Sequence, residues 1–212
     1  QIPTILKCNS ANSLMSDTAG KNQAVTATVQ DALRLGCAAI GFTIYPGSDM
    51  ALDMFEEISE MRAEAASVGI PTVIWSYPRG EAITKDGETA IDIAAYAAQI
   101  AALLGAHIIK IKLSTDHLEN KDAKKVYEDQ GIDISTQAKR VEHCMQAAFG
   151  GRRIVVFSGG AAKGSDAVYE DAIAIRDGGG NGSIIGRNSF QRSREDALAM
   201  LGKLVDIYLG KA

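Results

Sequence analysis

The sequence alternates between short apolar runs and longer segments with helical spacing, and this alternation restricts the possible fold more than any other feature. Six runs are short, rich in β-branched side chains and bounded by turn-forming residues, as buried parallel strands are. They cover residues 4–8, 38–45, 72–77, 107–113, 153–158 and 183–186. Apolar residues recur at helical spacing over residues 50–68, 90–104, 134–149, 167–177 and 194–209. Alternating strands and helices predict an α/β fold with a parallel sheet.

The positions of the polar residues distinguish between two kinds of parallel α/β fold. No GxGxxG or phosphate-loop pattern follows the first run, which disfavours a nucleotide-binding doubly wound sheet. Residues capable of chemistry instead end several different strands, as a (β/α)8 TIM barrel requires, because its active site is built from the loops after the strands. Six strands are two short of a closed barrel, so we expect the first two to precede Gln1.

No linker divides the chain, and we therefore expect residues 1–212 to form one TIM-barrel domain that is incomplete at its N-terminus. The stretch 116–130 is highly charged and shows no apolar periodicity. We expect this stretch to be a mobile insertion after the fourth run.

Composition excludes several classes of partner. The chain of 212 residues has 22 Lys and Arg against 26 Asp and Glu, which disfavours a nucleic-acid partner because such binding depends on basic side chains. No run of 18 apolar residues occurs, so we expect no membrane partner. The three cysteines are unpatterned, which indicates a reducing cytoplasm rather than a disulfide framework. The three histidines lack ligand spacing, and we expect no metal.

The apolar run 107–113 contains two lysines, Lys110 and Lys112, which a strand would place on the same side of the sheet. Burial and a neighbouring cation both lower the pKa of a lysine, so that a usable fraction is neutral amine near pH 7. A neutral amine attacks a ketone, and the resulting iminium withdraws electrons from a carbon–carbon bond. Alternatively, both side chains extend to solvent at the end of the strand. The strand pattern alone does not separate the two interpretations.

The run 72–77 leads into Trp75, Tyr77 and Arg79 in close succession. Alternation places Trp75 and Tyr77 on one face, and Pro78 turns the chain so that Arg79 can face the mouth of a barrel. A tyrosine relays a proton if a neighbouring cation lowers its pKa from about 10. The alternative interpretation is an aromatic plug beneath an arginine that faces solvent.

Glycines end the last two runs. Ser158, Gly159 and Gly160 follow one of them, and Gly186 and Arg187 follow the other. Glycine lets backbone N–H groups approach an anion closely, and an arginine completes a phosphate cradle. A single Ser-Gly-Gly is weak evidence because glycine serves many turns, but its combination with a later Gly-Arg strand end is more specific.

Five motifs occur in order, at residues 43–48, 75–80, 109–112, 158–160 and 185–188. With them the chain resembles the archaeal-type class I fructose-bisphosphate aldolases, which also occur in bacteria, over nearly its whole length. The resemblance implies a TIM barrel, a lysine Schiff base, no cofactor and reversible cleavage of fructose 1,6-bisphosphate. It also implies a cytoplasmic homo-oligomer, commonly a decamer, whose partners are sugar phosphates.

The resemblance assigns roles to individual residues. Lys110 matches the Schiff-base lysine with Lys112 beside it, Tyr77 matches the proton-relay tyrosine, and Trp75 and Arg79 line the same mouth. Five residues match the site for the ketose-side phosphate: Ser158, Gly159, Gly160, Gly186 and Arg187. The family begins with two further strands, the first of which carries a substrate-contacting aspartate, and this sequence contains neither strand.

Two other functions remain open. A related synthase of aromatic amino-acid precursors, of the aminodideoxyheptulosonate type, uses the same lysine, and condensation onto aspartate semialdehyde would distinguish it. A non-catalytic sugar-phosphate-binding barrel would bind its ligand without covalent trapping on a lysine.

Overall fold

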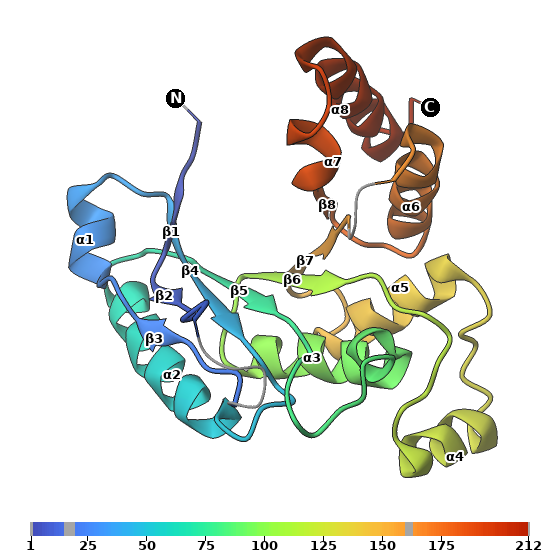
Figure 1. Cartoon of the computed structure of the whole chain (residues 1–212), viewed down its shortest axis with the longest axis horizontal. Helices are drawn as coiled ribbons and strands as arrows, with labels where there is room; N and C mark the ends of the chain where they lie inside the picture. Colours follow the sequence, from blue (N-terminus) through green and yellow to red (C-terminus); the bar gives the residue numbers. More distant parts are fainter. Residues whose placement is uncertain (1, 15–19, 160–162, 212) are drawn as a thin grey trace.

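The computed structural model describes residues 2–14, 20–159 and 163–211, and within them six parallel strands form one sheet (Figure 1). Their order is β1 (Ile5–Lys7), β4 (Ala39–Ile44), β5 (Thr72–Ser76), β6 (Ile108–Lys112), β7 (Ile154–Ser158) and β8 (Ser183–Ile184). Each strand falls within one of the six predicted runs, which confirms the α/β class and the parallel sheet. Over the described residues the sheet is an open part-barrel with β1 and β8 at its edges.

The five predicted helices are confirmed as α2 (Ala51–Ser67), α3 (Ile91–Leu103), α5 (Gln137–Ala147), α6 (Ser165–Asp177) and α8 (Arg194–Tyr208). The sequence analysis missed only short elements: the hairpin of β2 (Asn9–Ser10) and β3 (Ala24–Val25), α1 (Val29–Arg34), the 3-10 helix η1 (Gly87–Thr89), α4 (Lys121–Asp129) and α7 (Arg187–Phe190). No helix within the described ranges is long and apolar enough to cross a membrane.

The core lies between the sheet and the helices α2, α3 and α5, which run along one side of it (Figure 1). Helix α3 packs close to the strands because its inward side chains are small, with Ala94, Ala98 and Ala101 buried. Ile109 and Ile111 of β6 are completely buried in this core, and burying such a side chain contributes about 1.5–3 kcal/mol. Because side chains alternate along a strand, the lysines of β6 lie on the opposite face.

The stretch 116–130, which the sequence predicts as a mobile insertion, contains the regular helix α4. The Asn120 side chain caps the helix by accepting hydrogen bonds from the N–H groups of Asp122 and Ala123. The Tyr127 hydroxyl lies 2.6 Å from Nε2 of His143 in α5, which anchors α4 against its neighbour. No residue of α4 is fully buried, but Ala123, Val126 and Tyr127 recur at helical spacing, a periodic signal that the sequence analysis missed in this short and highly charged stretch.

Candidate active site

A cavity of about 360 Å³ opens where β5, β6, β7 and β8 end. Its lining residues are Tyr77, Arg79, Lys110, Lys112, Ser158, Gly159, Ile184, Gly186, Arg187 and Phe190. The structure thus brings together eight of the ten site residues expected from the sequence. Of the other two, Trp75 lies elsewhere, and Gly160 is outside the described residues.

The two lysines of β6 reach the cavity from the same face of the sheet. Burial alternates along the strand, with Ile109 and Ile111 in the core and Lys110 and Lys112 on the cavity side. The Lys110 Nζ lies 5.8 Å from the centre of the Tyr77 ring, within the range of a cation–π interaction. The expected placement of both lysines on one side of the sheet is therefore confirmed.

Two basic side chains, Lys110 and Arg79, lie near the Tyr77 ring at the end of β5. Its N–H donates to the Ile44 carbonyl at 3.1 Å, which extends the pairing of β5 with β4 by one residue. The Arg79 N–H donates to the Tyr77 carbonyl at 2.7 Å across Pro78, and this tight turn brings the Arg79 guanidinium 5.6 Å from the Tyr77 ring centre. The turn that was expected to direct Arg79 toward the mouth is present.

Trp75 faces the same side of the sheet, but its indole extends across Gly41 of β4 and is not among the side chains that line the cavity. A Cβ on Gly41 would lie 2.2 Å from two ring carbons of Trp75. The indole can therefore occupy this position only because residue 41 is glycine. Trp75 therefore packs against β4 at Gly41 instead of lining the cavity.

The glycine-rich ends of β7 and β8 meet through Asn188, which the sequence analysis did not single out. The buried Asn188 side chain donates to the Gly159 carbonyl at 3.3 Å and accepts from the Lys163 N–H at 2.8 Å. The Gly159 N–H donates to the Ile184 carbonyl at 3.4 Å. A Cβ on Gly159 would lie 3.2 Å from Ile185 Cδ1, so glycine allows these loops to approach one another.

The sequence analysis also missed Glu88, a carboxylate beside the cavity. The carboxylate accepts hydrogen bonds from Lys112 Nζ at 2.8 Å and Lys85 Nζ at 2.9 Å, and it lies 3.6 Å from Arg79 Nε. Burial opposes ionisation of Glu88, but the hydrogen bonds from the two lysines outweigh it and hold the pKa below its usual value. One glutamate in a charged loop carries no local signal of such a role.

A parallel sheet with lysines and a tyrosine in a cavity at its strand ends belongs to the class of TIM-barrel-type α/β enzymes. The profile of the DeoC/LacD family of aldolases matches residues 1–192. The chain is a member of this family.

Individual relatives narrow the comparison. The fructose-bisphosphate aldolase class 1 of Thermoproteus tenax is 34% identical over 211 residues, which cover 99% of this chain and 69% of the relative. The probable fructose-bisphosphate aldolase class 1 of Chlamydia muridarum is 29% identical over 225 residues, which cover 99% of this chain and 62% of the relative. The chain thus spans slightly more than two thirds of the Thermoproteus tenax relative and slightly less than two thirds of the Chlamydia muridarum relative. The resemblance to archaeal-type class I aldolases is confirmed.

A solved structure is also similar. An archaeal fructose-1,6-bisphosphate aldolase, with its catalytic lysine covalently bound to the carbinolamine intermediate of the substrate, superposes with a TM-score of 0.80. It is 31% identical to this chain, and the match covers 98% of this chain and 71% of that structure.

Proposed function

We propose that this cavity is the active site of a class I fructose-bisphosphate aldolase, which cleaves fructose 1,6-bisphosphate reversibly into dihydroxyacetone phosphate and glyceraldehyde 3-phosphate. The observation that carries the proposal is that Lys110, Tyr77 and the glycine ends of β7 and β8 line one cavity. An amine, a proton acceptor and an anion cradle are the three parts that this reaction needs.

Lys110 is the nucleophile in this proposal. Lys112 is engaged in an ion pair with Glu88, and an ammonium has no lone pair with which to attack a carbonyl. Lys110 lies instead beside the Tyr77 ring, close to the group that handles the proton. The contacts of the two lysines therefore support different roles for them.

The reaction begins when the Lys110 amine adds to the C2 carbonyl; the adduct takes up one proton from solvent and loses water, which gives an iminium. Tyr77, as the phenolate, accepts the proton of the C4 hydroxyl while the C3–C4 bond breaks, and the electron pair of that bond moves to the iminium to form an enamine. Glyceraldehyde 3-phosphate departs as the aldehyde. Tyr77 returns the proton to C3, and water then hydrolyses the iminium to release dihydroxyacetone phosphate and restore the amine.

The phosphate on the ketose side is held at the ends of β7 and β8. Arg187, Gly159 and Gly186 line this part of the cavity, where the glycines leave room for a phosphate, and Ser158 adds a hydroxyl. A fixed phosphate presents the ketone to Lys110 in one orientation, which lowers the entropic part of the barrier. Gly160 remains an expected contributor.

The assembly and compartment are further parts of the proposal. By resemblance to its family, the protein is a cytoplasmic homo-oligomer of single barrel domains that acts on sugar phosphates. Sedimentation velocity of the purified protein tests the assembly, and a monomer would contradict it.

Borohydride trapping tests the chemistry. With dihydroxyacetone phosphate and borohydride, we expect added mass on the peptide that contains Lys110. The variant Lys110→Met removes the adduct, whereas the matched variant Lys112→Met retains it. A wild-type protein that gains no mass at Lys110 or Lys112 would contradict the proposed function.

A further inference from the structure

Glu88 bonds to two cations of the cavity without lining the cavity itself. Its carboxylate accepts from Lys112 at 2.8 Å and lies 3.6 Å from Arg79 Nε, and both of these residues line the cavity. The Glu88 side chain is 15% exposed and that of Lys112 is 23% exposed, whereas Lys85, its third partner, is 86% exposed. Water therefore screens the pair with Lys112 much less than the pair with Lys85.

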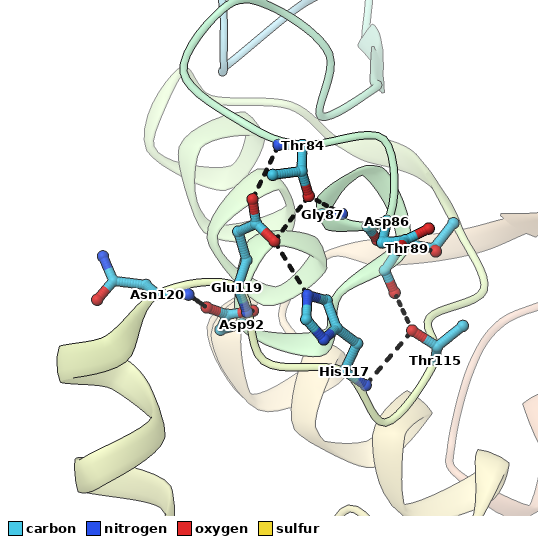
Figure 2. A network of polar contacts seen from close by, with 9 residues as sticks. All are labelled: Thr84, Asp86, Gly87, Thr89, Asp92, Thr115, His117, Glu119 and Asn120. Carbon is cyan, nitrogen blue, oxygen red and sulfur yellow. Dashed lines mark hydrogen bonds and ion pairs between the residues drawn. The ribbon is translucent and has the colours of Figure 1, made fainter.

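The segment that carries Glu88 is fastened on both sides to the loop that continues β6 (Figure 2). Before Glu88, the N–H and hydroxyl of Thr84 donate to the Glu119 carboxylate at 2.8 and 2.9 Å. After Glu88, the Thr115 N–H donates to the Thr89 carbonyl at 2.7 Å. The loop 113–120 follows directly from Lys112, so one continuous stretch carries the lysine and holds its carboxylate partner.

We call the contacts of Thr84, Gly87, Thr89, Thr115 and Glu119 the latch. A Cβ on Gly87 would lie 2.7 Å from the Glu119 carboxyl carbon, so glycine at position 87 lets the carboxylate lie in its present position against the backbone.

Two neighbours of the latch hold Glu119 from its other sides (Figure 2). His117 Nε2 lies 3.0 Å from the Glu119 carboxylate. The Asp92 carboxylate accepts from the N–H groups of Glu119 and Asn120 at 3.1 and 2.9 Å. These bonds fix both the backbone and the carboxylate of Glu119.

We propose that Glu88, held in place by the latch, is a positioning residue that aims Lys112 and Arg79 at the substrate. The proposal rests on the proposed function of the same cavity. Lys112, Arg79 and Arg187 all line that cavity, and cations so close together repel one another. The negative charge of Glu88 offsets this repulsion and fixes two of these three cations in direction.

Substitutions at Glu88 test the proposal by steady-state cleavage of fructose 1,6-bisphosphate in the intact protein. For Glu88→Gln we expect KM to rise about 10-fold and kcat to change by less than about 3-fold, because binding contacts are misdirected and Lys110 is retained. Glu88→Asp keeps the charge on a shorter side chain and should recover part of the affinity. The control Glu142→Gln removes an exposed ion pair with Lys139 and should leave KM unchanged.

The possible outcomes separate this proposal from the function on which it rests. If the wild-type protein is not trapped by borohydride, the proposed function fails. If it is trapped but Glu88→Gln has the wild-type KM, the positioning role fails. A purely structural role would lower the melting temperature of Glu88→Gln without changing KM, and that result also overturns the proposal. Should Glu88→Gln not fold, the KM of Glu88→Asp decides.

A double-mutant cycle tests the latch. Glu119→Gln should raise KM through Glu88, so the Glu88→Gln/Glu119→Gln double variant should be no worse than Glu88→Gln alone. Additive increases in KM would show that Glu119 does not act through Glu88 and would overturn the latch.

Discussion

The indole of Trp75 lies where any residue other than glycine at position 41 would place its Cβ, 2.2 Å from two ring carbons. Residues 41 and 75 come from adjacent parallel strands, β4 and β5. The packing on this face of the sheet therefore depends on the large Trp75 ring lying over Gly41, which has no Cβ.

We expect Gly41→Ala to destabilise the protein by about 1–3 kcal/mol, because the added methyl group forces the indole or the strand to move. Urea unfolding followed by circular dichroism measures the effect. The control Gly202→Ala lies in helix α8 with open space at its Cβ, and it should stabilise the fold by about 0.5–1 kcal/mol. Equal stability of Gly41→Ala and the parent protein would show that the indole is not fixed there.

The sequence predicted those features that depend on neighbouring residues along the chain. The six strands are visible because β-branched runs end at turn residues, and the common face of Lys110 and Lys112 follows from the two-residue period of a strand. Alternation also gave the face of Trp75, but the direction of its ring depends on Gly41 in another strand. The spacing of residues within one strand does not show which residue of a neighbouring strand will lie beside the ring.

The sequence analysis also missed Glu88 and α4, for two different reasons. Glu88 acquires its role from Lys112, which lies 24 positions away, and nothing local distinguishes it from other exposed-looking acidic residues. Helix α4 has local signals in the capping residue Asn120 and in Ala123, Val126 and Tyr127 at helical spacing, but its high charge and its lack of fully buried residues led the sequence analysis to miss it.

Tyr77→Phe should separate covalent chemistry from proton transfer. Removing the hydroxyl leaves Lys110 and the phosphate cradle intact, so borohydride trapping with dihydroxyacetone phosphate should persist, while kcat for cleavage falls about 100-fold or more. Full turnover in this variant would exclude Tyr77 as the proton relay.

Chelation should leave the activity unchanged. In the proposed mechanism the iminium on Lys110 accepts the electrons that a Lewis-acid metal would otherwise stabilise, so cleavage in excess EDTA should match the untreated rate. The measurement is the initial rate after prolonged incubation with the chelator. A loss that added zinc restores would contradict the Schiff-base mechanism.

The attachment of α4 should weaken in acid because it depends on His143. Burial lowers the pKa of His143 below the usual 6.5, so the folded state favours the neutral ring that faces the Tyr127 hydroxyl. When the helix detaches, His143 regains its ordinary pKa and binds a proton more readily. The stabilisation is therefore complete above pH 6.5 and is lost as the pH falls below that value toward the folded-state pKa. Hydrogen exchange of the α4 amides, corrected for intrinsic rates, should show less protection at about pH 5 than at about pH 8. His143→Phe should remove this difference, and equal protection at both pH values in the parent protein would contradict the anchoring role of the pair.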